Sequence, residues 1–330
     1  MGAFEITAIP PNQLVLGGGW VFAVKADAMS SVRFKARYFA WGNLQCPAVD
    51  YANTFTPTAS FTSLRLVLTL AAKNSWLVST FYFVAAYLNA PIDETLWIRP
   101  PEGLDVPLGH GCILKKALYG TKQAGRCWWS HLSSHLLNLG FEATLHDSSL
   151  YINMSKDAFI WIHVDDSVVV AKDRLVMDDI KNVLTASFRL KWNKGISLII
   201  GVDVSRIPGG YFLSQCGVSN KILNKHWDRK LKHKTPLPAN VTLTTLPDSH
   251  QPIQRTDFLS IIGSLSCIVN ATRPNMCFAV NLLLRHQKNP GTEHWKALKH
   301  FLGYLKHTVS YGVCLCPDPS MGIEVYSDAS

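Results

Sequence analysis

The sequence predicts an α+β fold, and three features of its pattern carry that prediction. Over the first two-thirds, short apolar runs rich in Val, Ile and aromatic residues occur among longer stretches with helical periodicity. A polar stretch with four prolines follows over 228–255, which is typical of a linker. Three further helical segments come after it. The order strand, helix, strand, hairpin, helix, hairpin indicates an α+β protein.

The elements of the first half are expected in the following order: strands over 21–25 and 32–40, a helix over 60–72, a strand over 77–84, a helix over 122–139, a strand over 149–152, a hairpin over 159–171 and a helix over 173–188. Ser60 is a cap candidate for the first helix. In the second helix Leu132, Leu136 and Leu139 recur at helical spacing, and Gly140 is expected to end it.

The second half is expected to contain a hairpin of strands 198–206 and 211–214, helices over 258–270, 275–287 and 293–307, and a last strand over 322–328. These elements predict four regions: 1–228, a linker over 229–256, a helical region over 257–309, and the start of another domain over 310–330.

The chain carries a formal net charge of +9, which favours a polyanionic partner, nucleic acid first and an anionic membrane surface second. No apolar run reaches the roughly 20 residues that cross a bilayer, so we expect no membrane span. None of the eight cysteines forms a C-x-x-C pair, and reduced thiols in an intracellular protein are expected. The sequence does not distinguish cytoplasm from nucleus.

Two adjacent carboxylates, Asp165 and Asp166, are expected at the turn between two apolar strands. Carboxylate oxygens are the ligands that Mg²⁺ prefers, so a metal site is one interpretation. The alternative is a turn in which aspartate serves only as a good turn former.

Several short motifs, in their order along the chain, make the first interpretation specific. They are Lys35-Ala36-Arg37, 54–58, 62–65, 86–91, 118–126, 164–166 and Thr272-Arg273-Pro274. From about Trp20 onward this series resembles the reverse transcriptase of copia-type LTR retrotransposons. The resemblance implies a right hand with fingers and an antiparallel palm sheet over 1–228 and a helical thumb or connection region over 257–309. It further implies that 310–330 is the truncated start of a ribonuclease H-like domain, with Asp328 as its first acidic residue.

The resemblance also implies an RNA-directed DNA polymerase that uses two Mg²⁺ ions, with Asp165 and Asp166 as metal ligands. A third aspartate is expected four residues before Ala86, where this chain has Tyr82. Tyrosine carries a neutral phenol at pH 7 and cannot readily bridge two metal ions. Loss of that ligand is expected to raise the barrier by roughly 4 kcal/mol, about a thousandfold in rate. Trp41 also replaces a basic residue of the fingers pattern.

Five further residues are candidates for contacts with nucleotide or template by the same resemblance: Lys35, Arg37, Gln123, Arg126 and Lys191. Lys35 and Arg37 are alternatively solvated strand charges, and Arg126 is alternatively the partner of a structural carboxylate. The expected partners are an RNA template, an RNA–DNA or DNA primer duplex and deoxynucleoside triphosphates. The leading hypothesis is a catalytically impaired reverse transcriptase. The alternatives are residual activity, a non-catalytic nucleic-acid-binding remnant and a relic without a selected role.

Overall fold

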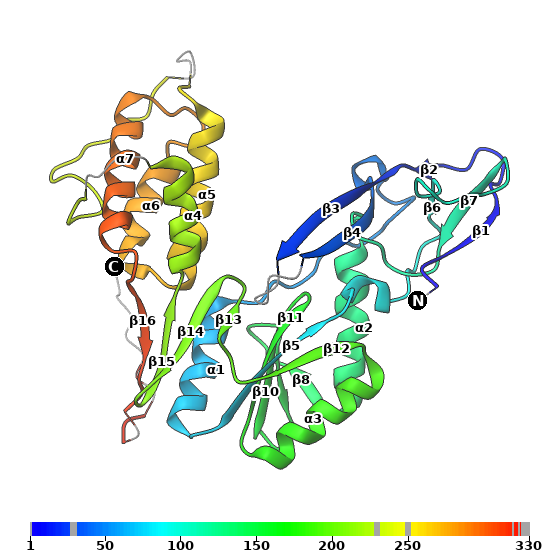
Figure 1. Ribbon diagram of the computed structural model, residues 1–330, viewed down its shortest axis with the longest axis horizontal. Helices are drawn as coiled ribbons and strands as arrows, with labels where there is room; N and C mark the ends of the chain where they lie inside the picture. Colours follow the sequence, from blue (N-terminus) through cyan, green and yellow to red (C-terminus); the bar gives the residue numbers. More distant parts are fainter. Residues whose placement is uncertain are drawn as a thin grey trace. The chain divides into compact units, whose positions relative to one another are not determined.

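The computed structural model describes residues 2–26, 32–227, 232–247, 252–318, 320–322 and 324. It divides into two compact units. The first comprises Met1–Ala59, Thr80–Val169 and Arg174–Trp192, and the second comprises Ser60–Ser79, Val170–Asp173 and Asn193–Ser330. Both helices and sheets are present, which confirms the α+β class (Figure 1). In the described part of the chain, no helix has the length and apolar character that crossing a membrane requires.

A six-stranded sheet carries the candidate site. Its strand order is β12 (Leu190–Lys194), β5 (Leu77–Phe83), β11 (Asp166–Ala171), β10 (Ala158–His163), β9 (Leu150–Asn153) and β8 (Phe141–Ala143). The pairs β8–β9 and β9–β10 are antiparallel. Two helices of the same unit, α2 (Ala124–Asn138) and α3 (Arg174–Ser187), flank this sheet (Figure 1). The ring of Phe83 on β5 lies 4.8 Å from that of Trp128 on α2 and 5.4 Å from that of Phe188. Phe188 directly follows α3, so aromatic packing holds α2 and the segment at the end of α3 against β5.

The N-terminal part of the first unit forms two smaller sheets. One is the ribbon of β3 (Gly18–Ala26) and β4 (Val32–Ala40), and the other has the order β1 (Phe4–Ala8), β7 (His110–Leu114), β6 (Trp97–Ile98) and β2 (Val15–Leu16). Single-turn helices lie at η1 (Gly42–Leu44) and η2 (Ala86–Asn89). The Ala40 amide donates to the Tyr119 carbonyl at 2.8 Å, and the Trp41 amide donates to the Gly17 carbonyl at 2.9 Å. These bonds fix the base of the ribbon.

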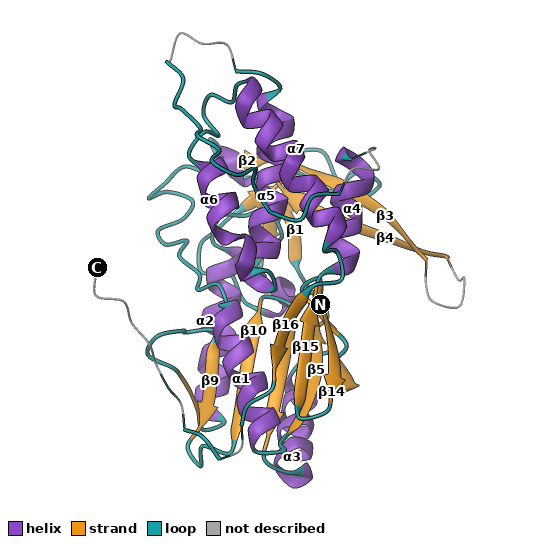
Figure 2. Cartoon of the chain, turned by 90° about the vertical axis from the view of Figure 1, so that its left-hand side faces the viewer, coloured by secondary structure: helices purple, strands orange, loops and turns teal. Residues whose placement is uncertain are grey.

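The second unit combines a small sheet with a helical core. Its elements are α1 (Phe61–Lys73), the sheet of β13 (Leu198–Ile199), β14 (Val202–Ile207), β15 (Gly210–Ser214) and β16 (Gly312–Leu315), and the helices α4 (Cys216–His226), α5 (Arg255–Ala271), η3 (Pro274–Met276), α6 (Cys277–Leu284) and α7 (Thr292–His307). Figure 2 shows α4 to α7 gathered into one bundle. Phe258, Leu265, Leu298 and Phe301 are completely buried in its core.

Several expected elements are confirmed. The helix expected over 60–72 is α1, and the Ser60 hydroxyl caps it by accepting from the Thr62 amide at 3.0 Å. The helix expected over 122–139 is α2, followed by Gly140 at φ +78°. The hairpin over 159–171 is β10 and β11.

Other expectations were wrong or incomplete. The single helix over 275–287 is the short turn η3 followed by α6, which ends at Leu284. Several elements were not expected: the strands β1, β2, β6, β7, β8, β12 and β16 and the helix α4. Within the expected linker, residues 232–247 and 252–254 contain no helix or strand, yet Leu237 and Leu243 pack against the helical core. The strand over 322–328 and Asp328 lie largely or wholly outside the described residues, so the four-region division stays a prediction.

Candidate active site

The paired aspartates lie at the junction of a two-residue turn with strained backbone and the strand that follows it. Val164 and Asp165 connect β10 to β11, and Asp166 is the first residue of β11. Val164 has φ +56°, in the left-handed region that β-branched residues rarely adopt. Such a conformation costs on the order of 1–3 kcal/mol and persists only where the surroundings hold it. The indole Nε1 of buried Trp128 donates to the Val164 carbonyl at 3.0 Å, so a core side chain of α2 holds the turn in place.

Replacing Val164 by glycine tests this strain. Glycine adopts positive φ without the steric cost that a branched side chain has there. We expect Val164→Gly to raise the free energy of unfolding by about 1 kcal/mol, since relief of strain outweighs the added entropy of the unfolded chain. Urea denaturation followed by tryptophan fluorescence measures the change. A loss of stability of similar size would show that Val164 is not strained.

Asp165 is the most constrained group of the site. Its carbonyl accepts from the Phe83 amide at 2.9 Å, which places the turn beside Tyr82 on β5. Its Oδ1 atom is buried and has no hydrogen-bond partner among the described residues. A buried carboxylate oxygen without a partner is unfavourable, and a bound cation is one way to satisfy it.

Burial raises the pKa of Asp165, and the neighbouring Asp166 raises it further, while Arg37, Lys35 and His163 act in the opposite direction. Burial also raises the pKa of Asp166, which His163 partly opposes. Both shifts mean that the two carboxylates lack enough positive charge nearby to stabilise their ionised forms fully. A cation bound by these two carboxylates would supply that charge.

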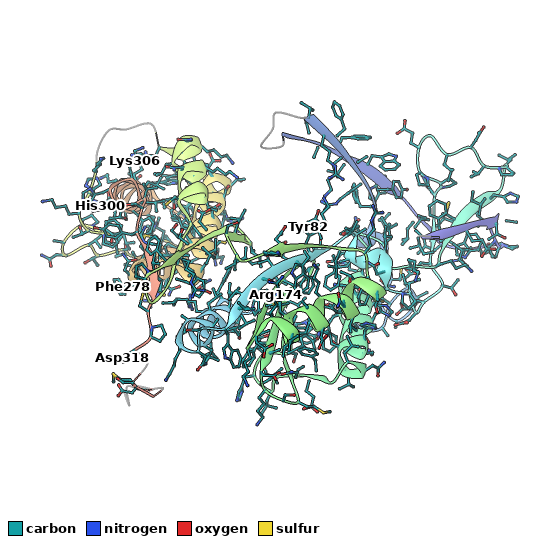
Figure 3. All side chains as sticks on the ribbon, turned by 60° about the horizontal axis from the view of Figure 1, so that its bottom comes forward. Tyr82, Arg174, Phe278, His300, Lys306 and Asp318 are labelled. Atoms are coloured by element: carbon teal, nitrogen blue, oxygen red, sulfur yellow. The ribbon has the colours of Figure 1, made fainter. Side chains whose placement is uncertain are left out.

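The donor set fits one divalent ion better than two. Asp165 and Asp166 offer hard oxygen ligands of the kind that Mg²⁺ prefers. No cluster of three or more His, Cys, Asp or Glu side chains suited to a metal ion is found in the described part of the chain. The position of the expected third carboxylate is Tyr82, half-buried on β5 (Figure 3). The Lys191 Nζ atom lies over its ring, 5.6 Å from the centroid.

Asp165, Asp166 and Tyr82 line one cavity of about 960 Å³ in the first unit, whereas Lys191 is not among its lining residues. Its lining includes the acidic pair Asp165 and Asp166, the cationic side chains of β4, Tyr82 and Tyr119. Alternation along β4 places Arg33, Lys35 and Arg37 on the same face of the strand. The sequence predicted Lys35 and Arg37 as candidates but missed Arg33, although the same two-residue spacing identifies it.

Tyr119 also lines the cavity, where it interacts with both Arg37 and Asp165. The Arg37 guanidinium carbon lies 5.4 Å from the centroid of the Tyr119 ring. Burial raises the pKa of Tyr119 to about 12, and Asp165 contributes to the rise. Its hydroxyl is buried without a hydrogen-bond partner among the described residues. Tyr119 therefore presents a neutral, unsatisfied phenol close to the acidic turn.

Gln123 and Arg126 are not among the residues that line this cavity. Gln123 is 1% exposed and its amide is bonded within the protein: it accepts from the Gln45 Nε2 atom at 3.0 Å and donates to the Asp50 carbonyl at 2.9 Å. Arg126 is half-buried in the first turn of α2. The structure thus brings Lys35, Arg37, Tyr82 and the two aspartates together, whereas template contact by Gln123 and Arg126 stays a prediction.

Comparison with known proteins gives the family. A family model described as reverse transcriptase (RNA-dependent DNA polymerase) matches residues 2–236. The chain is 32% identical over 329 residues to the retrovirus-related Pol polyprotein from transposon RE2 of Arabidopsis thaliana, with 97% of this chain and 22% of that protein covered. It is 31% identical over 345 residues to the corresponding polyprotein from transposon TNT 1-94 of Nicotiana tabacum, with 99% and 26% covered.

The chain therefore belongs to the reverse transcriptase (RNA-dependent DNA polymerase) family. More narrowly, these relatives are copia-type retrotransposon Pol polyproteins, which confirms the resemblance drawn from the motifs. The chain spans about a quarter of the length of the curated relatives it matches. Among solved structures, a foamy viral protease–reverse transcriptase in complex with double-stranded DNA matches with a TM-score of 0.43 and 10% identity, over 92% of this chain and 45% of that one.

Proposed function

We propose that this chain is an RNA-directed DNA polymerase domain whose nucleotidyl transfer is strongly impaired. Family membership supports the polymerase class. We infer the impairment from the composition of the acidic site. Asp165 and Asp166 lie at the turn, and the adjacent β5 position is Tyr82 rather than a third aspartate. The expected substrates are a primer paired with an RNA template and a deoxynucleoside triphosphate.

The roles of the residues follow from their chemistry. Asp165 and Asp166 would hold one Mg²⁺ ion, which, when bound, lowers the pKa of the primer 3′-hydroxyl and neutralises charge on the phosphates. Arg33, Lys35 and Arg37 face the cavity and offer cationic contacts to a triphosphate or to template phosphates. Tyr82 supplies no carboxylate to share between two ions, so the site is expected to hold one ion rather than the two that the resemblance implies.

Primer extension tests the proposal. Extension of oligo(dT) on poly(rA) is expected to be weak with Mg²⁺ or Mn²⁺, and to disappear in Asp165→Asn. Asp105→Asn is the matched control, because Asp105 is exposed and is not among the cavity-lining residues. Extension at a rate typical of enzymes, about 1 to 10³ per second, would overturn the impairment. Activity that survives Asp165→Asn would overturn the assignment of the acidic pair.

A second candidate function is nucleic-acid binding without catalysis, which the three basic residues of β4 favour. We expect Lys35→Ala/Arg37→Ala to weaken binding of a fluorescent template–primer at least tenfold and to reduce the slope of log affinity against log salt by about 1 to 2. Fluorescence anisotropy at several salt concentrations measures both. Lys156→Ala/Lys172→Ala is the control, since these exposed lysines are not cavity-lining residues. An equal loss in both double variants would show that only net charge matters.

A further inference from the structure

A second cavity of the first unit has only acidic residues among its charged lining residues, although the whole chain has a net positive charge. It measures about 260 Å³ and lies between the end of α2, the β9–β10 turn and α3. Its floor is apolar, formed by buried Leu136, Phe141, Ile160, Ile180 and Leu184. Its rim carries two carboxylates, Asp157 and Asp179. Among the described residues that line it, none is Lys or Arg, and the exposed Lys156, between the lining residues Ser155 and Asp157, is not itself a lining residue.

The surroundings of this cavity expose apolar side chains. Met154, next to two lining residues on the β9–β10 turn, is 75% exposed. Leu175 on α3, one turn before Asp179, is 79% exposed, and Val183 one turn after it is a lining residue with 39% exposure. Arg174, labelled in Figure 3 at the start of α3, is paired with Asp178 at 3.5 Å. Large exposed apolar side chains around a concave site are typical of interaction surfaces.

The charges decide which kind of partner fits. The whole chain carries +9, so an acidic rim is unusual for it and disfavours nucleic acid at this place. Asp157 accepts a hydrogen bond from the Asn153 amide group, whereas Asp179 accepts none from any described residue. A volume just below that of ordinary ligand pockets suits one large apolar side chain rather than a whole cofactor.

We propose that this cavity is a docking site for a basic peptide segment of another protein, with one leucine or aromatic side chain in the apolar floor and a lysine or arginine at the rim carboxylates. The apolar anchor contributes affinity by burial, and the opposite charges fix its register and exclude acidic partners. The site is separate from the polymerase cavity and does not depend on the proposed function, since the two cavities share no lining residue.

A labelled eight-residue peptide of alternating leucine and lysine is the probe. Fluorescence anisotropy is expected to show binding to the full chain, with a Kd at least tenfold higher for Asp157→Asn/Asp179→Asn. The matched control is Asp105→Asn/Asp203→Asn, which changes the net charge equally at residues that are not cavity-lining. A peptide in which glutamate replaces lysine should not bind. Equal affinities in the two double variants, or binding of the glutamate peptide, would overturn the proposal.

Hydrogen–deuterium exchange of the unmodified chain supplies a readout that does not depend on folding of a variant. We expect the lysine peptide to slow exchange in segments 153–160 and 174–184 and to leave β4 unchanged. Protection of these segments by an RNA oligonucleotide instead would overturn the proposal. So would concentration-dependent self-association in sedimentation that Asp157→Asn/Asp179→Asn abolishes, because the occupant would then be a second copy.

Discussion

Replacing Tyr82 by aspartate is expected to raise the rate of primer extension by about a thousandfold, which corresponds to roughly 4 kcal/mol in the barrier. Tyr82 lies on β5, beside the turn that carries Asp165 and Asp166, and it lines the same cavity. An aspartate there adds a third carboxylate to two that already lack sufficient positive charge. The three together would supply carboxylate ligands for the two metal ions that the resemblance implies.

The test compares Tyr82→Asp with Tyr82→Asn. The two replacements have nearly the same size, so both remove the ring and both release the Lys191 Nζ atom that lies over it. Only the aspartate adds a metal ligand. Primer extension with Mg²⁺ should therefore rise for Tyr82→Asp alone, and Mn²⁺ titration followed by electron paramagnetic resonance should change from one bound ion to two.

Two results would contradict this account. If Tyr82→Asn gained as much activity as Tyr82→Asp, the tyrosine would act by blocking the cavity rather than by lacking a carboxylate. If Tyr82→Asp bound two ions and still did not extend a primer, another departure would limit the chemistry. Trp41, where the family pattern has a basic residue, would then be the first position to restore.

The sequence predicted the acidic turn and its family because those signals are local. Asp165-Asp166 between two apolar strands and the Ser60 cap of α1 each depend on residues within a few positions. The placement of Lys35 and Arg37 on one face of β4 could also be predicted, since two-residue spacing alone determines it. Tyr82 was found by counting from Ala86, which needed the family pattern rather than any physical signal.

What the sequence did not predict depends on contacts between distant segments. The strands β2 and β6 have two residues each and form only because they pair with each other, and β6 also pairs with β7. The internal hydrogen bonds of Gln123 join it to Gln45 and Asp50, which lie more than 70 positions away. The hydrogen bond from Trp128 to the Val164 carbonyl likewise joins residues 36 positions apart, so no local sequence pattern predicts it.

Arg273→Ala is expected to destabilise the second unit by about 3–5 kcal/mol, the largest effect on stability that we predict. Arg273 is 2% exposed. Its Nη1 atom donates to the Thr308 carbonyl at 2.8 Å, and its Nη2 atom donates to the Thr308 hydroxyl at 2.7 Å. The guanidinium also lies 5.8 Å from the Tyr304 ring centroid and 5.5 Å from that of Tyr311. Truncation removes these contacts together and leaves the Thr308 carbonyl buried without this donor.

The same contacts explain why the Thr272-Arg273-Pro274 motif belongs to the fold rather than to the catalytic chemistry. Arg273 lies just after α5 and Thr308 just after α7, so one side chain joins the ends of these two helices. Thr272 adds a bond from its hydroxyl to the Gln215 Oε1 atom at 3.0 Å, which reaches the residue before α4. Among the residues that the structure describes, no carboxylate is a hydrogen-bond partner of Arg273, so its guanidinium depends on this geometry for its solvation.

Urea denaturation followed by circular dichroism at 222 nm measures the loss, with Arg285→Ala as the control because Arg285 is exposed at the end of α6. The control should change the free energy of unfolding by less than about 0.5 kcal/mol. Arg273→Lys separates charge from geometry: lysine keeps the charge but cannot donate two bonds to Thr308 in the fork arrangement, so it should recover only part of the loss. Full recovery by lysine would show that the positive charge over the two tyrosine rings, not the paired donation to Thr308, holds these elements together.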